Sequence, residues 1–242
     1  MLRRDAMGKG LVVVLSGPSC AGKTPLLLAI EKLYPDLHFA RPVPYTCRPP
    51  RPGEPIGRDF HFTTEDEIRS MPPDRFLVGK VRATWQAVDM LEVAGLLENN
   101  RRVVFELYYE LAARLMAHPA VVGRLGDFSV RTVFIAPVSD DELAAMLAHN
   151  PRLTERDLLS EISRIRQTTR AMRQGKKFTD AERADIQARA ATVWDEMQAG
   201  KQFTDYIVNH DGEDSTNWDF TPPPGDAGRL VRTFASILRD CG

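Results

Sequence analysis

The chain has 242 residues and a formal net charge of −1 at pH 7, and 43% of its residues are hydrophobic. This length can bury the core of one large domain, while the near-zero charge gives no global basic field, so a nucleic-acid partner is not indicated. There is no long apolar stretch for a signal peptide or a membrane span, and the three cysteines lack metal-ligand spacing. We therefore predict a cytoplasmic protein with reduced thiols.

The first predicted element is a buried strand over Leu11–Leu15, which a glycine-bounded turn follows at once. Residues Gly17–Thr24 match the pattern G-x-x-x-x-G-K-[ST], and a helix is predicted to begin near Gly22 or Lys23. In such a loop the backbone N–H groups and the helix N-terminus bind phosphate, and a lysine adds a mobile positive charge. The predicted phosphate-binding residues are Gly17, Ser19, Ala21, Gly22, Lys23 and Thr24, and the Thr24 hydroxyl is the predicted Mg²⁺ ligand.

A segment rich in proline and glycine, Thr46–Phe62, follows an extended stretch that ends at Tyr45. Arg48 and Arg51 stand three residues apart on this stiff backbone and can converge on one dianion. Taken alone, the segment is equally consistent with a solvated basic loop. Its position behind a phosphate-binding loop favours a clamp for a second phosphate.

The middle of the chain alternates between predicted helices and strands. A short acidic helix is expected near residues 64–67, and the pattern over Trp85–Asn99 is typical of a helix. Strands are expected over Val103–Leu107 and Arg131–Ala136, with a helix over Tyr109–Met116 between them. The second strand leads into a helix start that Ser139 or Asp140 would cap.

A nine-residue motif occurs twice near the C-terminal third of the chain. Residues 172–180 recur as residues 197–205, with Met, Gly, Lys, Phe, Thr and Asp in register, and a helix over Ala181–Ala199 joins the copies. Two copies are too few for a solenoid, so we infer a local duplication. It could alter the closure of a lid, make a contact in a homo-oligomer, or form a packed surface helix. A last strand that ends at Asn209 and a terminal helix over Leu230–Leu238 complete the pattern.

The two phosphate motifs together resemble the guanylate kinases. The second motif is Arg48-x-Pro50-Arg51-x-Gly53-Glu54-x-x-Gly57-x-Asp59-Phe60-x-Phe62. The resemblance implies an α/β P-loop NTPase fold with three α/β/α layers, a central parallel sheet, a small monophosphate-binding subdomain and a helical lid. It also implies a single domain, 1–242, with its core at 10–40, 100–140 and 203–242. The acceptor-binding subdomain would be 41–99, and the lid with the duplicated insert would be 141–202.

The resemblance also implies roles for particular residues. ATP would be the phosphoryl donor with Mg²⁺, and Asn209 would lie near the adenine. Arg48 and Arg51 would bind the acceptor phosphate, and Glu54 and Phe60 would also belong to the acceptor-binding site. Glu106 takes the place of an aspartate near the reacting phosphates, or it caps the helix that follows. Arg152 is the first lid arginine, and either Arg164 or Arg166 is the second.

The base-reading positions depart from the family pattern. Val78 stands where a glutamate reads guanine, and Trp85-Gln86-Ala87 replace a tyrosine-glycine-serine/threonine run. Pro44 replaces a serine, and Phe60 replaces a tyrosine. Because an apolar side chain cannot pair with a polar base edge, the guanine reader is lost unless Gln86 or a shifted register replaces it.

Three functions are consistent with these residues. The first is phosphoryl transfer from ATP to GMP, with Lys23, Arg48, Arg152 and Arg164 as catalytic residues. The second is the same chemistry on another phosphorylated acceptor, on which Trp85 would stack. The third is a catalytically silent interaction module of the same fold. Such modules lose the lysine of the phosphate loop, and Lys23 is present here.

Overall fold

A computed structural model describes residues 10–50, 57, 60–99, 102–122, 128–176 and 178–240. The chain divides into two units. The first comprises Met1–Val14, His38–Arg131 and Leu238–Gly242, and the second comprises Leu15–Leu37 and Thr132–Ile237.

A parallel sheet of four strands carries the phosphate-binding loop. Its strand order is β6-β1-β7-β8, where β1 is Gly10–Ser16, β6 is Arg102–Glu106, β7 is Phe128–Ala136 and β8 is Asp205–Val208. Apolar and β-branched residues form these strands because the sheet is covered on both faces. Residues 11–15 of β1 are at most 2% exposed. The predicted α/β class with a central parallel sheet is confirmed.

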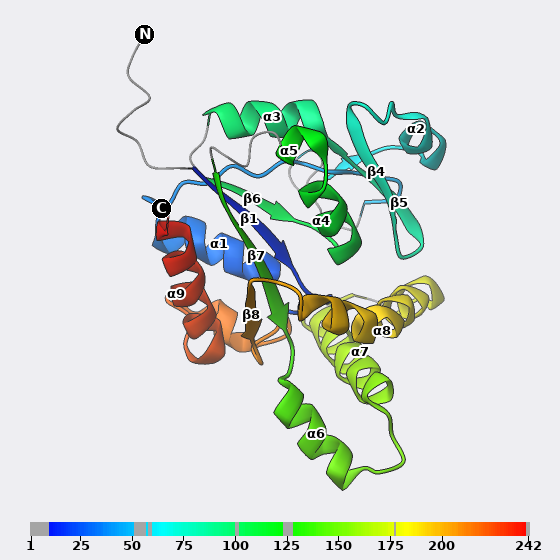
Figure 1. Ribbon diagram of the computed structural model, residues 1–242. Coiled ribbons are helices and arrows are strands. Elements are labelled where there is room, and N and C mark those ends of the chain that lie inside the picture. Colours follow the sequence, from blue (N-terminus) through cyan, green and yellow to red (C-terminus); the bar gives the residue numbers. More distant parts are fainter. Residues whose placement is uncertain are drawn as a thin grey trace. The chain divides into compact units, whose positions relative to one another are not determined.

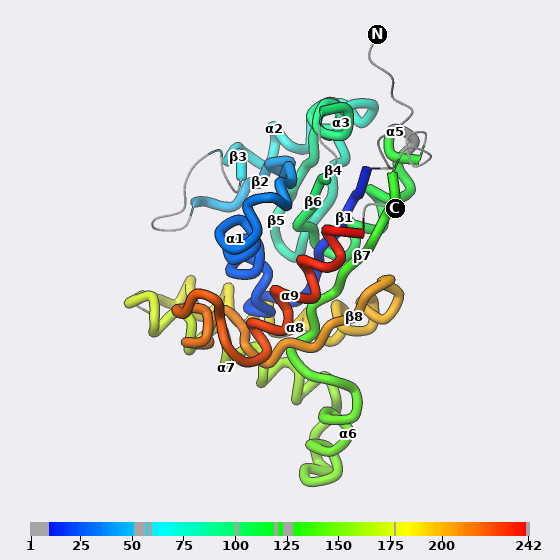
Figure 2. The backbone as a smooth tube through the Cα atoms, turned by 90° about the vertical axis from the view of Figure 1, so that its left-hand side faces the viewer, coloured from blue at the N-terminus to red at the C-terminus, as the bar shows by residue number. Residues whose placement is uncertain are grey.

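Helices flank the strands of the second unit. They are α1 (Lys23–Leu33), α6 (Asp140–His149), α7 (Glu155–Arg173), α8 (Asp180–Gly200) and α9 (Gly225–Arg239), with a short 3₁₀ turn at Thr216–Asp219. Figures 1 and 2 show α1 and α9 on one side of β7 and β8, and the α7–α8 pair on the other.

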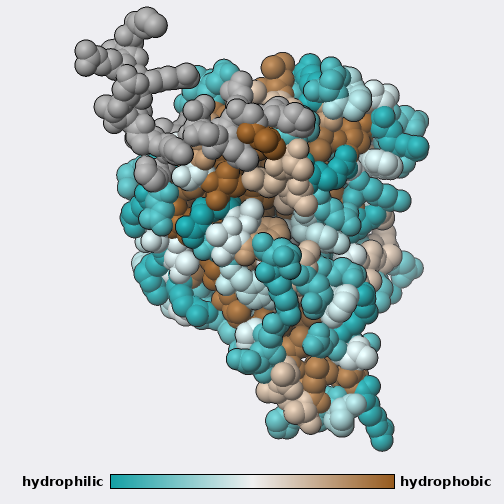
Figure 3. Space-filling model, viewed as in Figure 1, coloured by the Kyte–Doolittle hydropathy of each residue, from teal (hydrophilic) through white to brown (hydrophobic). Residues whose placement is uncertain are grey.

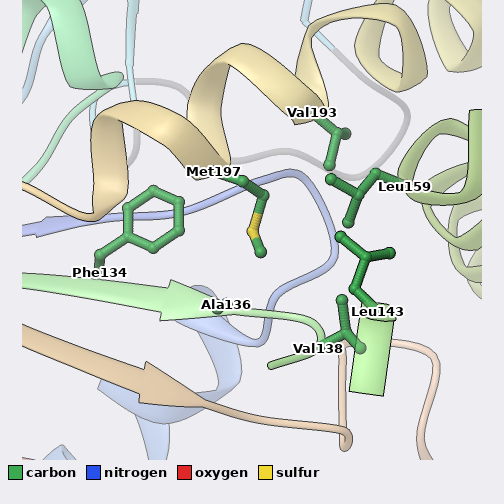
Figure 4. Close-up of a cluster of buried hydrophobic side chains, with 7 residues drawn as sticks. All are labelled: Phe134, Ala136, Val138, Leu143, Leu159, Val193 and Met197. Atoms are coloured by element: carbon green, nitrogen blue, oxygen red, sulfur yellow. The ribbon is translucent and has the colours of Figure 1, made fainter. Parts of the chain in front are cut away.

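The α7–α8 pair packs on β7 through a cluster of buried apolar side chains, shown in Figure 4. Phe134 and Ala136 of β7 point toward Val193 and Met197 of α8, and Leu159 joins them from α7. The Phe134 ring also stacks on Tyr206 with ring centroids 5.5 Å apart. This cluster fixes the two long helices against the end of the sheet.

The duplicated motif adopts two different structures. The first copy ends α7, turns at Gly175 with φ of 64°, and starts α8 with Thr179 as the N-cap. The second copy ends α8 at Gly200 and continues into β8 at Asp205. The helix predicted between the copies is confirmed as α8. The two copies of one sequence motif therefore form different turns, the first between two helices and the second between a helix and a strand.

The first unit contains a second four-stranded sheet in the order β3-β2-β5-β4. Its strands are β2 (Tyr45–Thr46), β3 (His61–Phe62), β4 (Phe76–Val81) and β5 (Thr84–Asp89), and the helices of this unit are α2 (Glu65–Ser70), α3 (Met90–Asn99), α4 (Tyr109–Met116) and α5 (Pro119–Val122). The short acidic helix expected near residues 64–67 is α2, which Thr64 begins with a capping box to Glu67.

The helix predicted over Trp85–Asn99 is wrong in its first part. Residues Thr84–Asp89 form β5, which pairs antiparallel with β4 in a hairpin. Asp89 ends this strand and accepts a 2.9 Å hydrogen bond from the amide of Leu91, so the helix begins only at Met90. Burial alone would raise the pKa of Asp89, but its bonds with Arg75 and Leu91 lower that pKa below its usual value. Pairing with β4 makes residues 84–89 a strand, and the spacing of their apolar side chains does not reveal this pairing.

The surface of the described residues is mixed. In the view of Figure 3, hydrophilic residues cover most of the described chain, and hydrophobic residues appear at separate places, including the tip formed by α6. Met146 of α6 and Leu153 after it are 40% and 43% exposed. No helix in the described ranges is long and apolar enough to cross a membrane.

Candidate functional site

The phosphate-binding loop connects β1 to α1 through backbone that only small residues adopt easily. Gly17 has φ of 146°, and a Cβ atom there would lie 2.5 Å from the carbonyl oxygen of Ile135. Gly22 has φ of 99°, and a Cβ atom there would lie 2.8 Å from Nδ2 of Asn209. Both glycines are therefore required by close backbone approach and by a positive φ. The motif residues predicted from the sequence lie in one continuous turn, Gly17–Thr24.

Lys23 lies over the loop that precedes it. Its Nζ donates to the carbonyl oxygens of Gly17 and Pro18, at 2.7 and 2.9 Å. An ammonium has three N–H donors, so one remains for a phosphate oxygen. Gly22 is the N-cap of α1 and has no side chain to cap the first turn. Since Pro25 lacks an N–H, the first-turn amides available to an anion are those of Lys23 and Thr24.

The residues at the start of α1 fit a Mg²⁺ ion held mainly by phosphate oxygens. The Thr24 side chain is exposed at the second position of the helix. The described residues contain no group of three or more His, Cys, Asp or Glu side chains that could hold a metal by themselves. Mg²⁺ prefers oxygen ligands and keeps several waters beside substrate phosphates, so one hydroxyl is a sufficient protein contribution.

The segment after β8 contacts the back of the phosphate loop. Asn209 is 0% exposed, and its Nδ2 donates to the carbonyl oxygens of Ala21, at 2.9 Å, and Asp211, at 2.6 Å. The amide of Glu213 donates to the carbonyl oxygen of Cys20 at 3.2 Å. Asn209 thus lies next to the loop, and its amide nitrogen holds the protein's own backbone. Its Oδ1 is buried without a partner among the described residues.

Asp211 organises the turn that follows Asn209. Burial alone would raise its pKa, but hydrogen bonds from Asn217, Ala227 and Ser215 lower the pKa below its usual value. Its carbonyl oxygen also accepts a 2.8 Å bond from Nε1 of Trp218. Trp218 therefore lies near Gly22. A Cβ atom added to Gly22 would be 3.3 Å from the tryptophan ring.

A pocket of about 220 Å³ lies beside this turn. It is lined by Arg170, Arg173, Gln174, Glu213, Ser215, Trp218 and Asp219. Sequence reasoning did not single out these residues. They come from two separate segments of the chain, 170–174 and 213–219, and only the packing of α7 against the segment after β8 brings them together.

The three candidate lid arginines have different surroundings. Arg152 is exposed between α6 and α7, and Arg164 is exposed on α7, where its Nη2 lies 2.5 Å from Glu161. The bond with Glu161 raises the pKa of Arg164. Arg166 instead donates to the carbonyl oxygens of Pro137, Asn209 and His210 at 3.0–3.3 Å. Of these arginines, Arg166 is the one that contacts the segment beside the phosphate loop in the described structure.

Part of the predicted acceptor clamp is described. The Arg48 guanidinium carbon lies 4.8 Å from the centroid of the Phe60 ring and 5.3 Å from that of Phe62. Its Nη1 donates to the carbonyl oxygen of Pro49 at 3.1 Å. The two aromatic rings thus hold the guanidinium plane of Arg48. Arg51 and Glu54, the other predicted clamp residues, lie outside the described residues.

The predicted base-reading residues Val78 and Gln86 lie on opposite faces of the second sheet. Directly paired residues in a sheet share a face. Val78 pairs with Ala87, Ala87 with Tyr45, and Tyr45 with His61, so these four residues form one row across all four strands. Gln86 is adjacent to Ala87 in β5 and therefore points to the other face. Gln86 and Val78 cannot line the same face of this sheet.

Glu106 is the last residue of β6. Its carboxylate lies 3.8 Å from Nη2 of Arg41, and both side chains are about a quarter exposed. The N-cap of the following helix α4 is Tyr108, which makes no side-chain capping bond. The geometry therefore places Glu106 at the strand end, beside an arginine.

Comparisons with known proteins indicate one family. A family model described as guanylate kinase matches residues 9–174. A guanylate kinase from Nitratidesulfovibrio vulgaris is 31% identical over 193 residues, which are 76% of this chain and 86% of the relative. One from Rhodococcus jostii is 29% identical over 212 residues, which are 86% of this chain and 84% of the relative. The crystal structure of guanylate kinase from Anaplasma phagocytophilum is similar in fold, with a TM-score of 0.57 and 16% identity, over 97% of this chain and 89% of that chain.

Proposed function

The chain belongs to the guanylate kinase family, and we propose that it transfers the γ-phosphoryl group of ATP to GMP, giving ADP and GDP. The observation that carries this proposal is the complete phosphate-binding loop, in which Lys23 and the first turn of α1 keep donors for an anion. A silent interaction module would have no use for this loop. We also propose that the chain works in the cytoplasm, with the two nucleotides as its partners.

On the donor side, Gly17, Ser19, Ala21, Gly22 and Lys23 would bind the phosphates of ATP, and Asn209 would lie close to its base. Mg²⁺, held by the Thr24 hydroxyl and phosphate oxygens, would neutralise charge that develops during transfer. The Lys23 ammonium, two of whose donors hold the carbonyls of Gly17 and Pro18, would offer its third N–H to a phosphate oxygen. Because the loop is already formed by its own hydrogen bonds, it needs no reorganisation to bind ATP.

On the acceptor side, Arg48 and Arg51 would bind the phosphate of the monophosphate, Glu54 and Phe60 would line the acceptor site, and Glu106 would lie near the reacting groups. The Arg48 guanidinium, stacked against two phenylalanine rings, is oriented in advance for a planar, bidentate contact with a dianion. Arg152 and Arg164 would approach the transferring group when the lid closes. Both are exposed side chains at positions that a closing motion can carry inward.

The same transfer to a different phosphorylated acceptor is a second candidate function. The row that contains Val78 continues through Ala87 and Tyr45, so the two residues that replace the family's polar base readers are apolar neighbours. Apolar side chains of this kind cannot reject a base by leaving a polar group unpaired. A base that stacks on aromatic side chains would be accepted through its shape.

The test is a measurement of ADP release from Mg·ATP with a panel of nucleoside monophosphates. We expect turnover with GMP, and we expect Lys23→Ala to lower kcat by roughly 100-fold or more because the preorganised charge is lost. Arg183→Ala, an exposed arginine of α8 that contacts Asp180, is the control. Turnover with another monophosphate but not with GMP would support the second candidate. No turnover with any acceptor would contradict both.

A further inference from the structure

The phosphate-binding loop is fixed from outside through two of its carbonyl groups. The Cys20 carbonyl accepts from the amide of Glu213, and the Ala21 carbonyl accepts from Nδ2 of Asn209. Pro25 stands four residues after Ala21 and has no N–H, so the helix itself cannot supply a donor to that carbonyl. Asn209 takes the place of this missing donor.

These two bonds determine where the amides of the loop point. In a planar trans peptide the carbonyl of one residue and the amide of the next point in opposite directions. A Cys20 carbonyl held outward therefore turns the amide of Ala21 to the other side, and the Ala21 carbonyl does the same for the amide of Gly22. The amide of Ala21 donates to the carbonyl oxygen of Pro18 at 3.2 Å and so closes the loop on itself. The segment Asn209–Glu213 thus fixes this turn and orients the amide of Gly22, an N–H group of the kind on which phosphate binding depends.

Arg166 holds this segment in turn. Its Nη1 donates to the carbonyl oxygen of Asn209 at 3.3 Å, and its Nη2 donates to those of His210, at 3.1 Å, and Pro137, at 3.0 Å. Pro137 follows the end of β7 and Asn209 follows the end of β8, two neighbouring parallel strands. One planar guanidinium therefore joins the carboxyl ends of both strands. Burial lowers the pKa of Arg166, partly offset by Asp214, yet an arginine remains charged at any physiological pH.

We propose that Arg166 is a positioning residue for ATP binding, which acts by fixing Asn209 and Glu213 against the carbonyls of the phosphate loop. This proposal rests on the proposed function for the identity of the nucleotide. It assigns to Arg166 a role different from that of a lid arginine, because its donors are already used by backbone carbonyls. Arg166 also belongs to α7, the helix that follows the predicted lid residue Arg152, so a movement of this helix would change the position of the phosphate loop.

The surroundings of the segment support the same role. Arg170, one turn after Arg166, lies 2.5 Å from Glu213, and both side chains are less than a fifth exposed. A Cβ atom on Gly212 would collide with the carbonyl oxygen of Cys20, so the segment lies as close to the loop as a backbone can. Close packing of this kind passes a displacement of the segment directly to the loop.

The test compares Arg166→Gln with Arg166→Lys by two measurements. Steady-state kinetics give KM for ATP and for GMP separately, and calorimetric titration with Mg·ATP gives the affinity without an acceptor. We expect Arg166→Gln to weaken Mg·ATP binding by about 10- to 100-fold, as for a misplacement of about 1 Å, with KM for GMP changed less than about threefold. Lysine keeps the charge without the fork, so Arg166→Lys should recover part of the loss.

Arg183→Gln serves as the matched control, because it removes an arginine from the neighbouring helix α8 at a surface pair with Asp180. If Arg166 had only a structural role, Arg166→Gln would lower the melting temperature and leave the Mg·ATP affinity of the folded protein unchanged. This result would overturn the proposal. Equal losses for ATP and GMP would also overturn it. If Arg166→Gln does not fold, the Mg·ATP affinity of Arg166→Lys tests the proposal by itself. An affinity equal to that of the wild type would then contradict it. A wild type that binds Mg·ATP but phosphorylates no acceptor would contradict the proposed function and leave the calorimetric comparison valid.

Discussion

Single residues of the phosphate loop show how the backbone limits side-chain chemistry. Cys20 is in the left-handed region with φ of 67°, an unusual conformation for a residue that has a side chain. It is 1% exposed, and burial raises the pKa of its thiol to about 12, although Arg170 acts in the opposite direction. A thiolate is the reactive form of cysteine, so the position of Cys20 in the phosphate-binding loop does not make it reactive.

We expect Cys20 to resist thiol reagents in the folded protein. In a variant with Cys47→Ser and Cys241→Ser, Cys20 is the remaining thiol of the chain. Its reaction with a disulfide reagent at about pH 8 should be at least about 100-fold slower than in denaturant, because the thiol is buried and protonated. Absorbance of the released thiolate measures the rate. Equally fast labelling of folded and unfolded protein would show that the loop exposes this residue.

At the scale of elements, the α7–α8 pair shows how a segment outside the family match becomes part of the core. The family model ends at residue 174, within the first copy of the duplicated motif, so α8 lies beyond the match. Yet α8 supplies Val193 and Met197 to the apolar cluster on β7 and leads directly into β8. Helix α8 is therefore part of the core of its unit rather than an attachment to its surface.

Gly200, at the end of α8, gives a test of this packing. Alanine is a better helix former than glycine by about 1 kcal/mol, so helix propensity alone predicts that Gly200→Ala stabilises the protein. A Cβ atom there would lie 2.5 Å from the ring of Phe134, which is fully buried. We expect a destabilisation of about 1–3 kcal/mol in the free energy of unfolding by urea, as for other overpacked cores.

Gly95→Ala is the matched control for this substitution. Gly95 lies inside α3, and an added Cβ would have no atom within 4 Å. This variant should be stabilised by about 0.5–1 kcal/mol, because propensity acts there without a clash. If Gly200→Ala stabilised the protein as much as Gly95→Ala, the close approach of α8 to β7 would be contradicted.

At the largest scale, His210 joins three elements of the second unit. Its Nδ1 lies 2.5 Å from Oδ2 of Asp226 at the start of α9, and its Nε2 lies 2.9 Å from Oε1 of Glu142 in α6. Arg229 also faces Asp226, at 3.0 Å. Burial alone would lower the pKa of His210, but its bonds with Glu142 and Asp226 raise the pKa above 6.5. Bonds from Ser139, together with that from His210, lower the pKa of Glu142 to about 2.

These shifts predict a pH window for the contribution of His210 to stability. A raised pKa means that the contribution is complete below the unfolded value of about 6.5 and is lost as the pH rises through the folded value. The lowered pKa of Glu142 means that its contribution is present above about 4.5 and is lost as the pH falls toward 2. The three-element contact is therefore strongest at about pH 4.5–6.5.

We expect His210→Gln to lower the melting temperature most at about pH 5.5, and to have a much smaller effect at about pH 9. Thermal unfolding followed by circular dichroism at both pH values measures the difference. His149→Gln, at the end of α6, controls for a general loss of a histidine. An effect that is the same at both pH values would contradict a charged His210.

The sequence by itself determined what is encoded by contiguous residues. The strand, loop and helix of the phosphate site are adjacent in the chain, and β1, Gly17–Thr24 and α1 were predicted correctly because the backbone pattern and the glycines act locally. The Ser139 cap is likewise confirmed as a capping box with Glu142. The family resemblance drawn from the two motifs is confirmed by the match to residues 9–174.

Only the tertiary structure decided what depends on residues far apart in the chain. Residues 84–89 form a strand because β4 pairs with them, although their spacing suits a helix. Sheet register separates Val78 from Gln86. Arg166 rather than Arg164 meets the strand ends because the packing of α7 selects which face of the helix is turned inward. Propensity and motif act over a few neighbours, whereas pairing, burial and hydrogen bonding to distant carbonyls arise only when the chain has folded.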